Sequence, residues 1–257
     1  MSEWLVLAIA MAAACAVVLA VPLLSQRRRG AGPEGGDAEV ETPDVLEYMT
    51  MMVGVVYAIV LGLAIAGVWE TRGSAEADVQ REAQALYEIS QRAAVLPREA
   101  REELREDIDA YVSHVVRTEW SHMIENQELT SRGDELLTEV REDIALRAPQ
   151  SELEAQTYQP MLERVAVVQD ARTTRAANAA STLPGVVWFG LIIGALVTVG
   201  LIFTMRMGRS FRELLVAGVF SALIAFLLFL VWDFDAPFGR SGTDSAEIFQ
   251  DLFPGAT

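Results

Sequence analysis

The feature that most constrains this chain is a set of four long apolar stretches that contain no charged side chain. They are 21, 22, 23 and 19 residues long and cover Trp4–Leu24, Tyr48–Trp69, Leu183–Met205 and Leu214–Trp232. The hydrocarbon core of a bilayer is about 30 Å thick, and a helix of about 20 residues crosses it. Because backbone groups in lipid must bond to one another, each stretch is expected to be helical. We therefore predict an all-α membrane protein with four transmembrane helices.

The charges lie outside these stretches and are strongly unbalanced. The chain has 20 basic and 36 acidic residues, a net charge of −16. Residues 70–182 contain 13 Arg and 23 Asp or Glu, which gives −10 for this block alone. Nucleic-acid binding needs a concentrated basic surface, which this distribution excludes. The expected partner is the lipid bilayer of a cell membrane, which the chain crosses several times.

The alternation of apolar and polar segments predicts the organisation of the chain. A helical domain is inserted between the second and third transmembrane helices. The predicted segments are 1–24 (first transmembrane helix), 25–47 (flexible linker rich in Gly and Pro), 48–69 (second transmembrane helix), 70–182 (acidic helical domain), 183–205 (third transmembrane helix), 206–213 (short loop), 214–232 (fourth transmembrane helix) and 233–257 (C-terminal turn and short helix).

The acidic block has the periodicity of amphipathic helices. Leu104, Ile108 and Tyr111, for example, recur at spacings of four and three. Pro97 suits the first turn of a helix. No proline interrupts residues 48–96, so the second transmembrane helix is predicted to continue out of the bilayer as one rod of about 70 Å.

Further along the chain, two patterns predict where helices begin. Ser151 and Glu154 form a capping box, in which the Ser and Glu side chains bond to backbone groups at the helix start. Pro184 marks a kink or the start of the third transmembrane helix.

Small residues recur every four positions in the transmembrane stretches. They are Gly54, Ala58, Gly62 and Ala66 in the second, and Gly190 and Gly194 in the third. Small residues let helices approach closely in lipid. One interpretation is ordinary packing within the chain. The other is a tight oligomer in which the second helices surround a narrow hydrophobic pore, a kind of constriction that gates by dewetting.

The sequence lacks the residues expected of several other functions. The absence of charged groups within the spans argues against a proton-coupled pump. The only two His, His114 and His122, and the single Cys15 are too few for a zinc site. No nucleophile–base set or phosphate-binding loop is present. We expect no enzyme activity, no metal and no cofactor.

A series of local motifs does point to a family. They are Glu82-Ala-x-Ala-Leu86, Pro97, Tyr111, Glu119-Trp120, Arg172, Arg175, Leu183-Pro184, Trp188 and Asp235-x-Pro237-Phe238-Gly239. In order and spacing they resemble the prokaryotic bestrophin-like domain family of membrane proteins. The resemblance extends over nearly all of the chain after the linker. Bestrophins, to which that family is distantly similar, are pentameric anion channels with a hydrophobic neck on the second membrane helix.

The resemblance implies a function for the second transmembrane helix. It suggests a homo-oligomeric channel for small anions, pentameric if the analogy is complete. The candidate neck residues are Val53, Val56, Tyr57 and Val60. Bestrophin necks are rich in Phe, whereas residues 48–69 contain none. The alternative is a non-conducting scaffold or sensor whose helical domain recruits a partner.

The side of the membrane that carries the acidic domain is open at this stage. The tightest Arg clusters, in 25–47 and 206–213, contain six Arg, and five others lie near the opposite membrane ends. Cytoplasmic loops are enriched in Arg, so this count favours an extracytoplasmic domain. The resemblance to bestrophins implies a cytoplasmic one.

Arg172 and Arg175 continue an apolar helix face and therefore need partners. One interpretation pairs them with Glu76, Asp78 or Glu82 on the neighbouring rod. The other makes them a basic ring at a pore mouth, where they would concentrate anions.

The remaining motif residues have simpler interpretations. Trp120 is expected to be a packing anchor, and Glu119 to pair with Arg117 or with an Arg across the bundle. The motif at 235–239 is expected to be a turn that ends the last transmembrane helix. Residues 244–253 then form a short helix that docks on the domain or on lipid.

Overall fold

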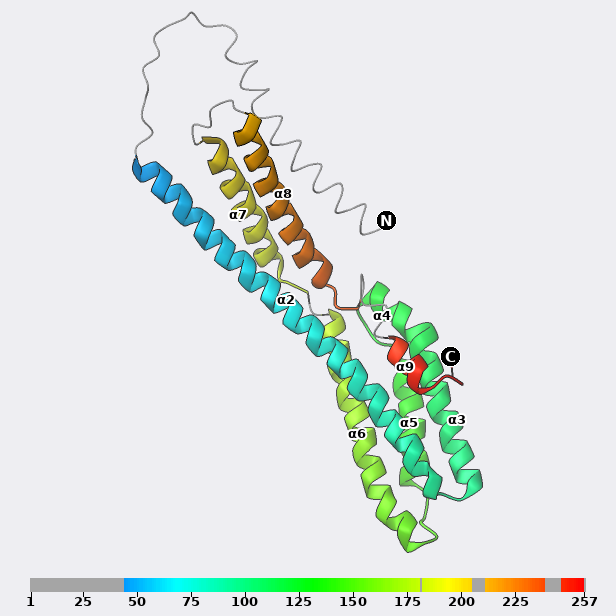
Figure 1. Ribbon diagram of the computed structural model, residues 1–257. Coiled ribbons are helices and arrows are strands. Elements are labelled where there is room, and N and C mark those ends of the chain that lie inside the picture. Colours follow the sequence, from blue (N-terminus) through cyan, green and yellow to red (C-terminus); the bar gives the residue numbers. More distant parts are fainter. Residues whose placement is uncertain (1–43, 181, 205–210, 239–245, 257) are drawn as a thin grey trace, which may run out of the picture. The chain divides into compact units, whose positions relative to one another are not determined.

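The computed structural model describes residues 44–180, 182–204, 211–238 and 246–256. These residues form two compact units (Figure 1). Within the described residues, unit 1 comprises 44–68, 183–204 and 211–234, and unit 2 comprises 69–180, 182, 235–238 and 246–256. The predicted first transmembrane helix, nearly all of the linker and most of the 206–213 loop lie outside the described residues.

Every element within the described ranges is helical, as the sequence predicts. The α-helices are α2 (Asp44–Arg92), α3 (Arg98–His114), α4 (Trp120–Asn126), α5 (Ser131–Ala145), α6 (Glu152–Ala180), α7 (Gly185–Thr204), α8 (Phe211–Phe234) and α9 (Glu247–Leu252). A short 3₁₀ turn, η1 (Ala93–Val95), follows α2, and a π-helical turn, η2 (Val115–Glu119), joins α3 to α4.

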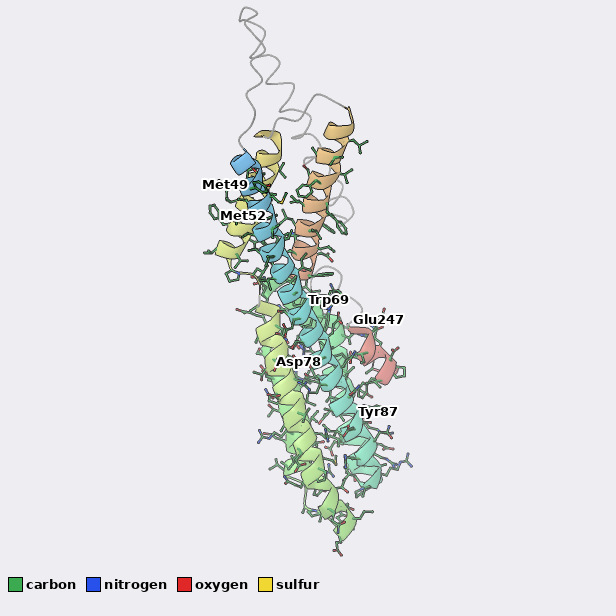
Figure 2. All side chains as sticks on the ribbon, turned by 60° about the vertical axis from the view of Figure 1, so that its left-hand side comes forward. Met49, Met52, Trp69, Asp78, Tyr87 and Glu247 are labelled. Carbon is green, nitrogen blue, oxygen red and sulfur yellow. The ribbon has the colours of Figure 1, made fainter. Side chains whose placement is uncertain are left out.

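Helix α2 is one continuous helix of 49 residues, which corresponds to about 74 Å. The predicted rod is therefore confirmed. The end of unit 1 at Val68 falls within this helix, so the same helix contributes to both units. Its first part carries the exposed Met49 and Met52, and its second part carries Asp78 and Tyr87 (Figure 2).

Unit 1 is built from the first part of α2 with α7 and α8. Its core includes Tyr57 and Leu61 of α2, Leu191 of α7 and Val231 of α8. Two helices, Tyr48–Val95 and Leu215–Phe234, are long and apolar enough to cross a membrane. The number rises to three if α6 and α7 are counted together as one broken span. Both findings place the chain among membrane proteins.

Unit 2 is a helical bundle formed by α3, α5 and α6 with the second part of α2 (Figure 1). Pro97 precedes the first residue of α3, as predicted. One of the two bonds of the predicted capping box of α6 is present, because the Glu154 amide donates to Ser151 Oγ at 3.2 Å. The Glu154 carboxylate accepts a hydrogen bond from the Gln150 amide at 2.8 Å.

The C-terminal tail is part of unit 2. Helix α8 ends at Phe234, and residues 235–238 form the predicted turn, although Gly239 lies outside the described residues. In α9 and just after it, Phe249 and Phe253 are buried in the core of the bundle. Phe253 packs edge-on against Tyr87 with ring centroids 6.2 Å apart. The tail helix therefore docks on the domain, one of its two expected positions.

Candidate functional site

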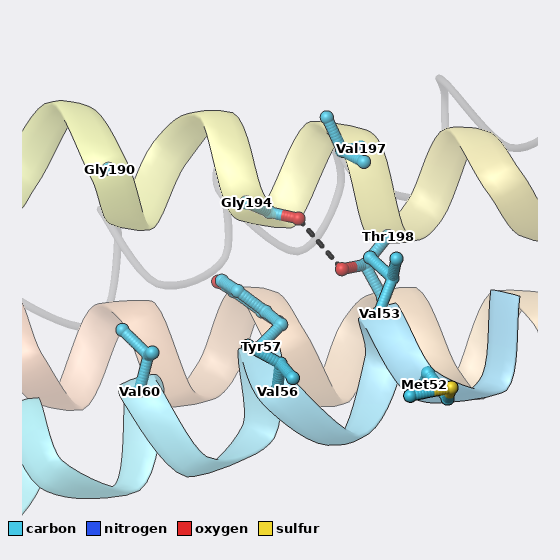
Figure 3. Close-up of a pocket in the computed structure, with 9 residues that line it drawn as sticks. All are labelled: Met52, Val53, Val56, Tyr57, Val60, Gly190, Gly194, Val197 and Thr198. Atoms are coloured by element: carbon cyan, nitrogen blue, oxygen red, sulfur yellow. Dashed lines mark hydrogen bonds between the residues drawn. The ribbon is translucent and has the colours of Figure 1, made fainter. Parts of the chain in front are cut away.

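The four predicted neck residues lie together along one apolar groove of unit 1 (Figure 3). The groove is open, has a volume of about 430 Å³ and lies between α2 and α7. Its lining residues are Met52, Val53, Val56, Tyr57 and Val60 of α2 and Gly190, Gly194, Val197 and Thr198 of α7.

The two hydroxyl groups of the groove are already bonded within unit 1. Tyr57 Oη donates to the backbone oxygen of Leu191 at 3.1 Å. Thr198 Oγ1 donates to the backbone oxygen of Gly194 at 2.8 Å. The rest of the lining is hydrocarbon, so the groove presents an apolar surface.

The position of the Tyr57 ring explains why residue 194 is a glycine. A Cβ atom added at Gly194 would lie 2.5 Å from Tyr57 Cδ2, whereas one added at Gly190 would meet nothing within 4 Å. Gly194 therefore provides the space into which the Tyr57 ring packs. Only 8% of Tyr57 is exposed, and its main contacts hold α7 against α2.

The other three neck candidates face outward. Val53, Val56 and Val60, called the valine strip here, are 39%, 59% and 47% exposed. They lie beside Tyr57 on α2, and no described part of unit 1 covers them. The valine strip is therefore an uncharged face of a membrane helix that is available to lipid or to another subunit.

The small-residue ridge of Gly54, Ala58, Gly62 and Ala66 lies on roughly the opposite side of α2, given about 3.6 residues per turn. Ala58, Gly62 and Ala66 are exposed. A Cβ atom at Gly54 or Gly62 would meet nothing within 4 Å. Packing within the described part of unit 1 therefore explains why residue 194 is a glycine, but it does not explain why the ridge residues are small.

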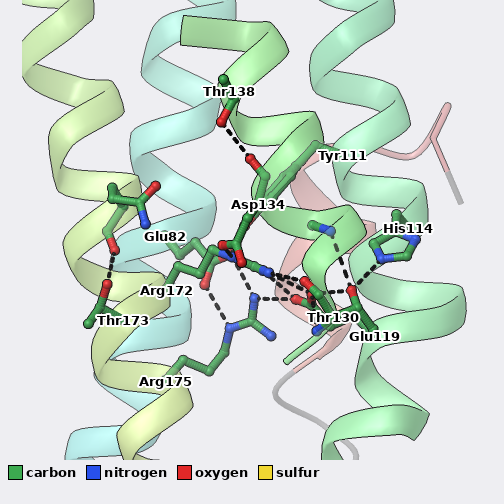
Figure 4. Close-up of polar contacts among 12 residues, drawn as sticks. Glu82, Tyr111, His114, Glu119, Thr130, Asp134, Thr138, Arg172, Thr173 and Arg175 are labelled. Atoms are coloured by element: carbon green, nitrogen blue, oxygen red, sulfur yellow. Dashed lines mark hydrogen bonds and ion pairs between the residues drawn. The ribbon is translucent and has the colours of Figure 1, made fainter. Parts of the chain in front are cut away.

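A second site is the buried charge cluster of unit 2, formed by Glu82, Glu119, Arg172 and Arg175 (Figure 4). All four residues are at most 1% exposed. They come from α2, η2 and α6, which are far apart in the sequence. The bundle brings together five motif residues that the sequence analysis singled out, because Tyr111 of α3 bonds to the same cluster.

Glu119 is the centre of the cluster. It accepts hydrogen bonds from Arg172 Nη1 at 2.5 Å and Nη2 at 2.8 Å, and from Arg175 Nη2 at 2.9 Å. The Thr130 hydroxyl and amide donate to it as well, at 2.7 and 3.2 Å. A π-helical turn ends at Glu119, and such turns add a residue to the helix and shift the faces of the residues that follow.

Arg172 has further partners besides Glu119. Its Nε donates to Asp134 Oδ1 at 2.8 Å, and its Nη2 donates to the Thr130 backbone oxygen at 2.9 Å. Its guanidinium lies 5.9 Å from the centroid of the Tyr111 ring. A buried guanidinium is stable only when its donors are used in this way.

Arg175 is bound mainly by Glu82. Its Nε and Nη2 donate to the two Glu82 oxygens at 2.9 and 3.1 Å. The Tyr111 hydroxyl donates to Glu82 Oε1 at 2.6 Å. Burial, and then the negative charge of Glu82, raise the pKa of Tyr111 well above its ordinary value, so this hydroxyl stays a donor.

The environment keeps Glu119 ionised. Burial alone would raise its pKa, but the hydrogen bond from Arg172 and the charge of Arg175 outweigh this effect and lower the pKa to about 2. Burial likewise disfavours the charged guanidinium of Arg172, but the bond to Glu119 raises its pKa overall. Glu119 and Arg172 are therefore fixed ions that do not exchange protons near neutral pH.

These contacts decide between the two interpretations of the arginines. A basic ring at a pore mouth is wrong, because Arg172 and Arg175 are 1% and 0% exposed and bound to carboxylates. The expected pairing with Glu82 is confirmed for Arg175. Arg172 instead uses Glu119 and Asp134. The pairing of Glu119 with an Arg across the bundle, one of its two expected partners, is thereby confirmed, whereas Asp134 was not expected.

Gly133 and Thr130 complete the cluster and were missed in the sequence. Thr130 is the N-cap of α5 and accepts a hydrogen bond from the Gly133 amide. A Cβ atom at Gly133 would collide with the Arg172 guanidinium and the Glu119 carboxylate. The sequence feature that could have indicated this contact is a glycine at position 133, two residues inside α5. At such a position alanine would make the helix more stable unless its methyl group collided with a neighbour.

The remaining motif residues lie in the packed core, in a turn or at the start of a helix. Trp120 is buried as expected and packs edge-on against Phe238 of the tail, with ring centroids 5.7 Å apart. In the turn at 235–238, Pro237 is buried and Asp235 is half-buried. Pro184 precedes α7, and its backbone oxygen accepts hydrogen bonds from the amides of Val187 and Trp188. Within the described residues, no group of His, Cys, Asp and Glu has the arrangement of a metal site.

Comparisons with known proteins agree with this architecture. Residues 6–242 match the model of the bestrophin-like domain family. A solved structure described as the crystal structure of a membrane protein is similar over 97% of this chain and 98% of its own, with a TM-score of 0.63 and 13% identity. At that identity the likeness concerns the fold alone. No curated protein matches the chain.

Proposed function

Because the chain belongs to the bestrophin-like domain family, we propose that it is an oligomeric membrane channel that conducts anions through a hydrophobic constriction on α2. In this proposal the chain crosses the membrane four times, through residues 4–24, the first part of α2, α7 and α8. The oligomer is a pentamer if it follows the bestrophin arrangement.

The valine strip is the observation that carries the proposal. Val53, Val56 and Val60 follow one side of α2, and they are exposed in the single chain. Around a symmetry axis, such strips would form a ring of hydrocarbon without polar groups. Narrow hydrocarbon rings close a pore to water and ions until they widen, which is gating by dewetting.

Tyr57 has a supporting role in this proposal. Its ring fills the space at Gly194, and its hydroxyl bonds to α7. These contacts fix the rotation of α2 relative to α7 and so the direction in which the valine strip points. Val56 is therefore a better position than Tyr57 for testing the constriction.

Unit 2 serves in this proposal as a rigid frame. Its two clustered arginines are buried and paired, and residues 70–182 carry a net charge of −10. A negative domain repels anions at long range, so it is not an electrostatic funnel for them. Selection of anions would then rest on the pore itself.

Chloride flux into liposomes that contain the purified protein tests this function. We expect flux with the natural chain and a larger flux with Val56→Ala, which widens the ring. Val55→Ala is the matched control, because Val55 is exposed to a similar degree, 55% against 59%, but points about 100° away around the helix. Absence of flux from all three proteins would leave the non-conducting scaffold as the function.

Labelling of an introduced cysteine decides the membrane side of unit 2. Glu102 is exposed on α3, so Glu102→Cys in a Cys15→Ala background offers one accessible thiol. Labelling only from the cytoplasm would support the bestrophin arrangement. Labelling only from outside would support the arginine count.

A further inference from the structure

Two carboxyl groups meet where α3 packs against α5. Asp107 of α3 and Asp143 of α5 are both half-buried, and their side chains are within hydrogen-bonding reach of each other. Asp143 Oδ2 is shielded from solvent and has no hydrogen-bond donor among the described residues. Two ionised carboxylates cannot bond to each other, since neither has a proton to donate.

The surrounding charges increase the cost of ionising both groups. Glu103 of α3 and Glu139 of α5 add negative charge around Asp107. Arg147, just beyond α5, favours ionisation of Asp143, but it is held by Glu103 at 2.7 Å. The pair therefore lacks a cation of its own.

We propose that Asp107 and Asp143 share one proton and form a pH-sensitive clasp between α3 and α5. With the proton present, one carboxyl donates to the other and links the two helices. When the proton is lost, two negative charges face each other across the same interface and weaken it. This clasp is independent of the proposed channel function.

The direction of the pH effect follows from the environment of Asp107. Burial, and then the charge of Asp143, raise its pKa from 3.8 to about 6. A carboxyl with a raised pKa in the folded protein stabilises the fold most below its ordinary pKa. Its contribution decreases from there and is lost as the pH rises through about 6.

The clasp lies close to the charge cluster. Tyr111 follows Asp107 by four residues, about one turn of α3, and donates to Glu82 in the cluster. A change in the spacing of α3 and α5 at Asp107 would therefore reach the contacts of Tyr111. This gives the acidic domain a route by which pH affects its most buried polar contacts.

Thermal unfolding of the full-length protein in detergent between pH 5 and pH 7.5 tests the clasp. Asp107→Asn keeps a donor for Asp143 at every pH. It should therefore raise Tm relative to the natural chain by about 3 °C at pH 7.5 and by about half as much at pH 5, where the folded protein still holds most of the shared proton. The difference between the two proteins is the quantity to measure, because burial lowers the pKa of His114 and gives it an opposing pH dependence.

Glu106→Gln is the matched control, since it removes the same charge one residue away at an exposed position of α3. Asp143→Asn should reproduce the effect of Asp107→Asn, and the double variant should add little to either. The proposal is wrong if Asp107→Asn and Glu106→Gln change Tm equally at pH 7.5. It is equally wrong if neither Asp variant alters the pH dependence.

Discussion

Charged side chains are buried in unit 2, whereas uncharged valines are exposed in unit 1. The four residues of the charge cluster are at most 1% exposed, while the valine strip is 39% to 59% exposed. A buried ion in a domain surrounded by water is stable only if each charge has partners. An exposed valine in lipid costs nothing, because lipid tails are equally apolar. The two units therefore follow opposite rules of burial.

This difference in burial means that the charge cluster and the valine strip give different evidence about function. Each guanidinium nitrogen of the charge cluster has a partner within the chain, so the cluster indicates stability and specific helix pairing. The valine strip is largely uncovered by the described residues, so it is a surface that lipid or another subunit can occupy. Four predictions test this contrast, from the largest expected effect to the smallest.

Removal of the central carboxylate should have the largest effect. Glu119→Ala leaves Arg172 and Arg175 without their shared partner inside unit 2. Loss of one member of a buried ion pair costs about 3–5 kcal/mol of unfolding free energy. Chemical denaturation measures it, with the exposed Glu125→Ala as the control. Equal stability of the two variants would show that the cluster is not a structural centre.

Acid should remove almost as much stability through the same residue. The pKa of Glu119 is lowered to about 2, so its contribution is present above its ordinary pKa of 4.5 and is lost as the pH falls towards 2. The difference corresponds to about 3 kcal/mol. Unfolding measured from pH 6 to pH 3 should show a steep loss that Glu119→Gln lacks. The same slope in both proteins would contradict this assignment.

An added methyl group at Gly133 should have an intermediate effect. It would collide with the Arg172 guanidinium and the Glu119 carboxylate, and overpacking of this kind costs about 2 kcal/mol. Gly73→Ala is the matched control, because a Cβ atom there meets nothing within 4 Å and alanine favours the helix. In thermal unfolding, we expect Gly133→Ala to lower Tm and Gly73→Ala to raise it slightly.

The smallest of the four effects is expected in unit 1. Gly194→Ala brings a methyl group against the Tyr57 ring and should cost about 1–2 kcal/mol, because an aromatic ring can shift slightly. Gly190→Ala has open space and should be neutral. Denaturation in mild detergent compares them. A larger loss of stability from Gly190→Ala would contradict the packing of the Tyr57 ring into the space at Gly194.

The sequence predicted the long elements because their signals are local. The uncharged stretch from Tyr48 and the absence of proline up to Leu96 were sufficient to predict α2 as a rod. The turn at Asp235 and the start of α3 at Pro97 follow from residues with strong backbone preferences. Such features depend on a few neighbouring residues and not on the rest of the fold.

The pairing of Arg175 with Glu82 was predicted, but the partners of Arg172 could not be predicted in the same way. Helical spacing shows that Arg172 lies on an inward face, but not which helix lies opposite it. The π-helical turn at Val115–Glu119 changes the side of the helix on which Glu119 lies, and the identities of those five residues do not predict such a turn. Asp134 and Thr130 enter the cluster only because α5 begins beside α6, which is a property of the assembled bundle.

Disulfide cross-linking at the valine strip tests the central claim most directly. In a Cys15→Ala background, Val56→Cys should form linked dimers in membranes upon oxidation, because the strips of neighbouring subunits would meet at the axis. Val55→Cys, which has similar exposure on a different face of α2, should link far less. Equal linking at both positions, or linking at Val55 alone, would contradict a constriction formed by the valine strip.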